Sequence, residues 1–184
     1  MFGEMLFTHF GVSGPIILTL SRDIAKWLRE GKTVELSLNL KPALTKEQLD
    51  KRICRDFEKY SRKQIKNALG DLLPSKMIST VIDLAFIDEN KFVNQISKAE
   101  RERLVDLLQD MVMTVTKTRP LSEAIVTAGG ISTKEINPKT MESKLIKDLY
   151  CVGEVVDVDA FTGGYNLQAA FSMGFVAGEA SSLE

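Results

Sequence analysis

Hydrophobic and polar positions follow two different periods along this chain. From Thr33 to Leu40 every second residue is apolar, which is typical of a half-buried strand, and Met113 and Val115 repeat that alternation later in the chain. Between these two stretches the apolar residues recur every three or four positions, which predicts amphipathic helices. The sequence therefore predicts an α+β fold with a small helical bundle inserted between β-segments.

Residues that start and stop helices refine this division. A Ser or Thr followed three positions later by Glu or Gln fits a capping box, in which each side chain accepts a hydrogen bond from a backbone N–H near the helix start. Proline at the first helical position and glycine after the last one are further boundary signals. The capping boxes expected are Thr45 with Gln48, Ser61 with Gln64, and Ser97 with Glu100. Further helices are expected from Pro15 to about Arg29, from Ser75 to about Ala85, and from about Gly164 to Ser181.

Composition and charge exclude several classes of protein. The 184 residues include 24 basic and 25 acidic side chains, so no basic surplus marks a nucleic-acid-binding protein. No apolar run approaches the roughly 20 residues that span a bilayer, and the N-terminus lacks the pattern of a signal peptide. Cys54 and Cys151 lack metal-ligand spacing and are expected to be reduced thiols in the core. We therefore expect a cytoplasmic protein without a metal site, a nucleic-acid partner or a membrane partner.

Glycine turns mark the C-terminal third. Two short apolar runs are expected to be strands: the run at 149–152 ends in Gly153-Glu154, and an earlier run at 124–127 ends in Ala128-Gly129-Gly130. A third turn, Gly163-Gly164, directly precedes the final helix. Glycine lets the backbone approach a ligand closely, and a helix N-terminus offers N–H groups and a partial positive charge to an electron-rich atom. A tight strand-to-helix turn without a ligand is the alternative interpretation.

Two faces of the final helix are expected to pack against other parts of the protein. Leu167, Phe171 and Phe175 form a bulky face. Small residues line a second face at helical spacing, and they permit close approach of another backbone. These residues are Ala170, Gly174, Ala177, Gly178 and Ser181.

Three segments resemble the YhiN/BaiN-type (HI0933-like) flavoproteins, a family of NAD(P)/FAD-dependent oxidoreductases of the two-dinucleotide-binding-domain class. They are Phe7 to Pro15, Val126 to Lys144, and Val152 to Ala170, in the family's order. The resemblance implies that residues 1–42 and 112–130 are β-rich remnants of a barrel-like substrate domain. It also implies that 43–111 are a helical insert, and that 131–184 are the C-terminal part of the FAD-binding domain and complete the edge of its sheet.

The resemblance also implies roles for the glycine turns. Gly153 and Glu154 would lie against the ribityl and pyrophosphate region of FAD, and the Gly129-Gly130 turn would approach the same cofactor. Gly163, Gly164 and Gln168 belong to the same motif. The backbone of Tyr165, Asn166 and Leu167 would face the pyrimidine edge of the flavin. The flavin would carry the hydride chemistry, with NADH or NADPH as the electron donor.

The family's N-terminal G-x-G-x-x-G unit, which holds the pyrophosphate on a helix N-terminus, is not found in this sequence. The chain is therefore expected to be the C-terminal portion of a flavoprotein, inactive alone and without bound FAD. Its expected partners are the missing N-terminal unit and, through the uncovered face of the last helix, further copies of itself.

His9, the single histidine, lies in the glycine-flanked segment that the family places near the flavin. It is a candidate proton relay, with a structural histidine in a tight turn as the alternative. Two alternatives for the whole chain also stay open at this stage. The chain could be a non-catalytic interaction module, or it could be part of a flavin-dependent RNA-modifying protein, which the near-zero net charge disfavours.

Overall fold

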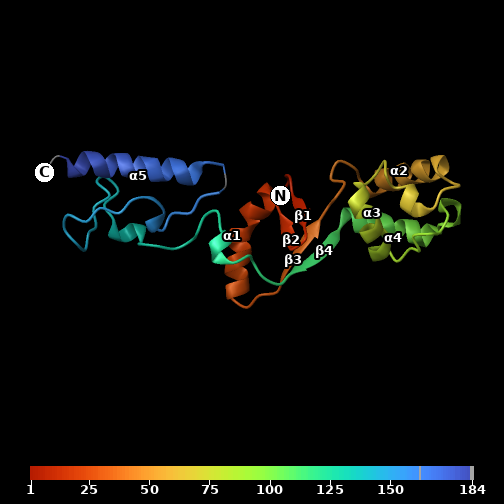
Figure 1. Cartoon of the computed structure of the whole chain (residues 1–184), viewed down its shortest axis with the longest axis horizontal. Coiled ribbons are helices and arrows are strands. Elements are labelled where there is room, and N and C mark those ends of the chain that lie inside the picture. Colours follow the sequence, from red (N-terminus) through yellow and green to blue (C-terminus); the bar gives the residue numbers. More distant parts are fainter. Residues whose placement is uncertain (162, 183–184) are drawn as a thin grey trace. The chain divides into compact units, whose positions relative to one another are not determined.

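The computed structural model describes residues 1–161 and 163–182, which contain five α-helices and two two-stranded sheets (Figure 1). The predicted α+β class is confirmed, although the described strands form two separate pairs and no closed barrel. The chain divides into two compact units. We call Glu35–Val115 the helical unit, and Met1–Val34 together with Thr116–Glu184 the glycine-rich unit.

Three helices of the helical unit surround an aliphatic core: α2 (Lys46–Lys59), α3 (Ser75–Leu84) and α4 (Lys98–Gln109). The chain enters through β3 (Val34–Leu38) and leaves through β4 (Met111–Val115), which pair with each other. Burying one Leu or Ile side chain contributes roughly 1.5–3 kcal/mol, so this core supports a separately folded unit. Its fully buried residues include Leu49, Ile53, Ile65, Leu69, Val81, Ile82, Leu104, Val105 and Leu108.

Two of the three predicted capping boxes are confirmed. The Thr45 hydroxyl accepts from Gln48 N at 3.3 Å while Thr45 N donates to the Gln48 side chain at 2.9 Å. Ser97 and Glu100 make the same reciprocal pair at the start of α4.

The third predicted box, Ser61 with Gln64, is wrong. Gln64 pairs instead with Phe92 in an isolated antiparallel bridge. Lys63 O accepts from Val93 N, and Ile65 N donates to Lys91 O, both at 2.9 Å. Backbone N–H and C=O groups near Gln64 therefore bond to the segment at 91–93 instead of to each other. Only a 3-10 turn, Ile65–Asn67, forms here.

Glu100 makes the helical unit sensitive to acid. Its carboxylate accepts from Lys91 Nζ at 2.7 and 2.9 Å and from Ser97 N at 2.7 Å, and these bonds lower its pKa from the ordinary 4.5 to about 2. A depressed pKa contributes stability above the ordinary value, and that stability is lost as the pH falls toward 2. We expect Glu100→Gln to be less stable by about 1–2 kcal/mol at pH 7.

The same variant should also lose less stability than the wild type between pH 5 and pH 2, as measured by urea unfolding. Glu102→Gln is the matched control. Glu102 Oε1 lies 3.7 Å from Lys98 Nζ in an exposed ion pair, which should contribute little to stability. Parallel pH profiles for the wild type and Glu100→Gln would contradict this account.

In the glycine-rich unit, β1 (Leu6–Thr8) and β2 (Gly11–Ser13) form an antiparallel hairpin that leads into α1 (Pro15–Arg29). The bounds of α1 match the prediction. Gly14 occupies the N-cap with a φ of 97°, and a Cβ there would lie 2.9 Å from Met5 Cα. Glycine is therefore needed at this position by both conformation and space.

The C-terminal part of this unit holds fewer strands than predicted. The apolar run at 124–127 follows a 3-10 turn, Leu121–Glu123, and forms no strand; Ile125 is 69% exposed. The run at 149–152 makes only a bridge, between Glu142 and Tyr150. Neither run has a strand partner along its length in the described residues, so neither becomes a ladder. The final helix, α5 (Tyr165–Ser181), forms as predicted.

None of the helices in the described residues combines the length and the apolar character that crossing a membrane requires. Both cysteines are free; Cys151 is buried and Cys54 is partly buried.

Candidate functional site

The site predicted from the glycine turns lies in the C-terminal part of the glycine-rich unit. Two turns distant in sequence meet there. Ile131 N donates to Val155 O at 2.8 Å, and Asp157 N donates to Ile131 O at 2.9 Å, which forms a parallel bridge beside Gly130. A Cβ on Gly130 would lie 2.4 Å from Val155 O. The structure therefore brings the Gly129-Gly130 turn directly against the segment that follows Gly153-Glu154, and protein backbone occupies the space at Gly130.

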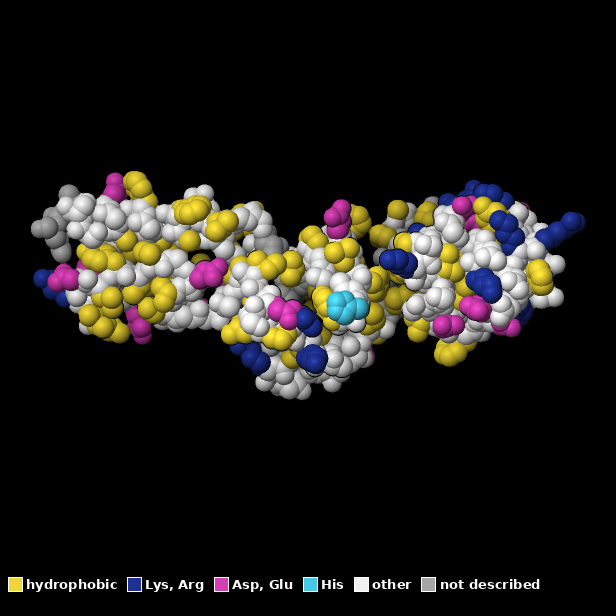
Figure 2. Space-filling view, viewed as in Figure 1, with side chains coloured by type: hydrophobic (Ala, Val, Ile, Leu, Met, Phe, Trp, Pro, Cys, Tyr) yellow, Lys and Arg dark blue, Asp and Glu magenta, His cyan; other side chains and the backbone are white. Residues whose placement is uncertain are grey.

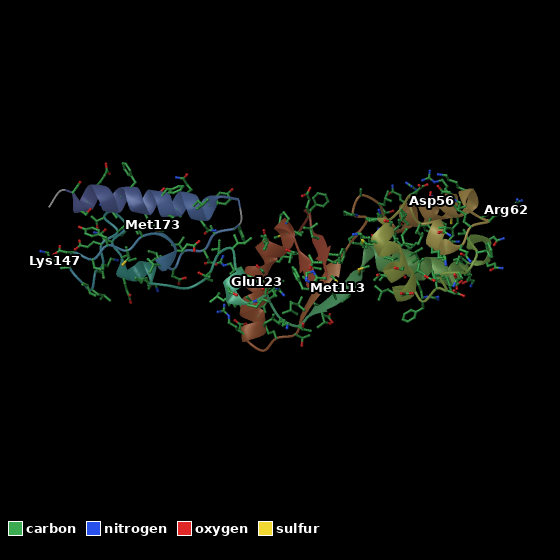
Figure 3. All side chains as sticks on the ribbon, viewed as in Figure 1. Asp56, Arg62, Met113, Glu123, Lys147 and Met173 are labelled. Carbon is green, nitrogen blue, oxygen red and sulfur yellow. The ribbon has the colours of Figure 1, made fainter. Side chains whose placement is uncertain are left out.

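A small apolar core supports this junction. Its buried residues are Ile136, Met141, Cys151, Val156 and Ala177. Cys151 N donates to Met141 O at 3.0 Å, which ties the segment before Gly153 to the loop below α5. In Figure 3 the Met173 side chain points from α5 toward this loop region, and Met173 packs against the same core. The glycine turns thus rest on a packed base.

Gly153 and Glu154 lie beside the first turns of α5. Gly153 has a φ of 73° and opens a 3-10 turn, Gly153–Val155, and a Cβ on it would lie 3.9 Å from Ala170 Cβ. Gly153, Glu154, Asn166 and Ala170 help to line a crevice of only about 10 Å³. A single water fills such a volume, so any larger ligand must lie outside the crevice. The carboxylate of Glu154 is exposed and makes no hydrogen bond or ion pair with the described residues.

The start of α5 leaves three backbone N–H groups without an acceptor inside the helix. Gly164 caps the helix with a φ of 89°, and none of the described residues beyond its chain neighbours has an atom within 4 Å of the position its Cβ would take. The first intrahelical bond runs from Gln168 N to Gly164 O at 3.0 Å. The N–H groups of Tyr165, Asn166 and Leu167 therefore have no acceptor within the helix. Gly129 is similar, with a φ of 103° and open space around it.

The Asn166 side chain has a role that sequence reasoning missed. Its Oδ1 accepts from Ala160 N at 2.8 Å, and its Nδ2 donates to Ala160 O at 3.0 Å. These two hydrogen bonds hold the preceding loop against the start of the helix. A second missed contact is the ion pair between Arg22 Nε and Asp159 Oδ2 at 2.6 Å. No local pattern reveals either contact, since each depends on how the loop at 157–161 folds back.

The bulky face of α5 is uncovered in the described residues (Figure 2). One side of the helix packs on the small core through Ala177, Met173 and Val176. Of the predicted small-residue face, Ala177 is buried and Ala170 partly buried, whereas Gly174 and Gly178 are exposed with open space around them. The opposite side exposes Leu167 by 63%, Phe171 by 69% and Phe175 by 66%, and Tyr165, in the first turn, is 64% exposed.

His9 is not joined to these turns by any described hydrogen bond, and it does not line the crevice. It lies exposed at the tip of the β1–β2 hairpin, where its ring meets Phe10 edge-on with centroids 5.0 Å apart. The guanidinium of Arg119 lies over the same Phe10 ring at 4.5 Å. Within the described part of the chain, no cluster of His, Cys, Asp or Glu could hold a metal ion.

Comparison with known proteins agrees with the motif resemblance. The chain is 33% identical over 98% of its length to a 3-dehydro-bile acid delta(4,6)-reductase of Clostridium scindens, of which it covers 44%. It is 33% identical over 95% of its length to a ribosomal RNA dihydrouridine synthase of Haemophilus influenzae, covering 41% of it, and 31% identical over 92% to the Escherichia coli enzyme of that name, covering 40%. The chain thus spans less than half the length of these curated relatives.

The comparison with protein families extends over most of the chain. Residues 1–126 match the family described as HI0933-like protein barrel and H2TH domain. This match contains the hairpin, α1 and the whole helical unit, while the relatives' similarity continues through the glycine turns and α5. The chain belongs to the HI0933-like flavoprotein family.

Proposed function

We propose that this chain forms the flavin-facing part of the FAD site in a flavin-dependent oxidoreductase. The observation that carries the proposal is the meeting of the Gly129-Gly130 turn, the Gly153-Glu154 turn and the N-terminal end of α5 on one packed base. The residues fit a flavin in two respects. Gly129 and Gly164 leave open space where side chains would otherwise project. The crevice is too small to hold the ring, so the ring would lie outside it, against this open space.

Each group has a plain physical task in this proposal. The N–H groups of Tyr165, Asn166 and Leu167 donate toward the electron-rich edge of the ring, and the positive end of the α5 dipole favours negative charge there. The free carboxylate of Glu154 accepts from ribityl or ribose hydroxyls. Asn166 holds the loop at Ala160 in place through its two hydrogen bonds. When bound, FAD supplies the hydride transfer itself.

The relatives' names indicate the reaction class. A delta(4,6)-reductase adds hydrogen across carbon–carbon double bonds, and dihydrouridine is uridine with two hydrogens added across one. We therefore propose that the full-length protein reduces a carbon–carbon double bond, which takes up one hydride and one proton. FAD would supply the hydride, NADH or NADPH would be the electron donor, and the proton would come from solvent or an acidic side chain. A steroid-like acid and RNA are the two substrate classes that these relatives suggest.

The proposal is tested on the full-length protein. It should purify yellow with about one FAD per chain, and NADH or NADPH should bleach it under anaerobic conditions. A well-folded preparation that takes up no FAD would exclude the flavoenzyme and favour a non-catalytic interaction module.

We further propose that the rest of the full-length protein covers the bulky face of α5. More than half of each curated relative lies outside the part matched by this chain. An uncovered apolar surface of this kind is unusual on a monomer in solution. In this proposal the remainder also holds the FAD pyrophosphate, through the charge-assisted hydrogen bonds that bind most strongly.

The 184-residue chain alone should therefore bind FAD only above micromolar concentrations and should self-associate. Calorimetric titration with FAD and light scattering measure the two properties. Phe171→Ser with Phe175→Ser should reduce self-association, whereas Phe86→Ser, which changes an 82% exposed side chain of the helical unit, should not. Tight stoichiometric FAD binding by a monomeric chain would contradict this assignment.

A further inference from the structure

A shallow groove on the helical unit has a strongly one-sided charge. It has a volume of about 690 Å³ and is lined by Leu44, Gln48, Lys51, Arg52, Cys54 and Arg55. Three of these side chains are cationic and none is a carboxylate. Figure 2 shows Lys and Arg side chains gathered over α2, at the top of this unit in the view.

The nearby carboxylates are paired with other cations, so Lys51 and Arg55 in the groove keep their positive charge unpaired. The two carboxylates of α2 that point toward the protein are neutralised: Asp50 accepts from Arg101 Nε at 2.7 Å, and Asp56 accepts from Arg52 Nε at 3.0 and 3.1 Å. Lys51 and Arg55, by contrast, are exposed and make no ion pair or hydrogen bond with the described residues. Glu47 and Glu58 are the exposed acids on the same helix, and neither lines the groove.

A further cation lies close by. Lys41, on the segment before α2, is partly buried, and its pKa is lowered first by that burial and then by the charge of Arg52. The smaller contribution, from Arg52, shows that Lys41 lies close enough to add its positive charge to that of the groove.

We propose that this groove binds the phosphate backbone of RNA. Lys51 and Arg55 are one helical turn apart, about 6 Å along the axis, so they can contact successive phosphates along a strand, and Gln48 adds a neutral donor on the same side. The expectation of no nucleic-acid partner rested on the net charge of the whole chain, and an average of that kind hides a local excess of cations. The inference rests on the proposed function for the choice of RNA between its two substrate classes.

The test is RNA binding by the 184-residue chain without flavin, so its outcome is independent of flavin chemistry. The probe is a fluorescein-labelled, unstructured 20-nucleotide RNA, titrated at several salt concentrations. Lys51→Gln with Arg55→Gln should weaken binding roughly tenfold and reduce the slope of log affinity against log salt by about 1.4, since each phosphate contact on a single strand contributes about 0.7. The control, Lys26→Gln with Lys76→Gln, removes the same charge from exposed positions on α1 and α3.

The outcomes separate cleanly once circular dichroism shows that both double variants keep the wild-type melting temperature. Loss of affinity in the groove variant with retention in the control supports the site. Equal losses in both variants, or no binding of RNA by the wild type, overturn it. Displacement of the RNA by polyglutamate at equal charge concentration also overturns it, because the groove would then fit an acidic protein segment at least as well.

Discussion

Gly130→Ala should destroy the junction between the two glycine turns. The new Cβ would lie 2.4 Å from Val155 O and 3.0 Å from its carbonyl carbon, and both are backbone atoms that no side-chain rotation can move away. The φ of 147° adds strain for any residue with a Cβ. We expect local destabilisation of at least about 3 kcal/mol. Hydrogen exchange of the Ile131 and Asp157 amides, which make the bridge, should accelerate by about a hundredfold or more.

Gly129→Ala is the matched control for this prediction. Gly129 also has a positive φ, of 103°, but its Cβ position has no neighbour within 4 Å among the described residues. The substitution should therefore cost only the conformational strain, about 1–2 kcal/mol, and the bridge amides should keep most of their protection. If both variants released these amides equally, close packing would not be the reason for glycine at position 130.

Gly164→Val should cause severe loss of FAD from the full-length protein while leaving the protein folded. In the described residues the space beside Gly164 is open, so the valine would meet no neighbour within the chain. In the proposed site that space belongs to the ring, and a β-branched side chain there would hold the ring away from the helix N-terminus. We expect the FAD content to fall at least about tenfold, a change that corresponds to roughly 1.4 kcal/mol of binding energy.

Strain at a left-handed position must be separated from loss of the ligand contact, and Gly31→Val provides that control. Gly31 ends α1 with a φ of 75° and likewise has no atom within 4 Å of its Cβ position. Both variants should lower the melting temperature by similar amounts, but Gly31→Val should keep its FAD. Equal flavin occupancy in the two variants would show that the Gly163-Gly164 turn is purely structural.

The sequence predicts the helices of this protein well because their signals are local. Pro15 and Gly31 bracket α1, and the reciprocal bonds of Thr45 with Gln48 require only residues three positions apart. The Ser61–Gln64 pattern has the same local signal but fails, because Lys63 and Ile65 bond to the distant segment at 91–93. The predicted strands at 124–127 and 149–152 fail for a related reason, since a strand requires a partner along its length.

The sequence names candidate residues for the site, but it does not predict how those residues pack against one another. Composition alone does not show that the Gly130 turn lies against Val155, or that the Asn166 side chain holds Ala160, because both contacts join segments that only the folded chain brings together. The roles of the site residues, His9 included, remain predictions.

Hydrogen exchange of the full-length apoprotein with and without FAD tests the central claim most directly. The proposed site predicts that FAD slows exchange at the amides of Tyr165, Asn166 and Leu167 and in the turns around Gly129 and Gly153, with little change in the helical unit. Slowed exchange confined to residues 45–109, or unchanged exchange at the start of α5 under saturating FAD, would contradict it.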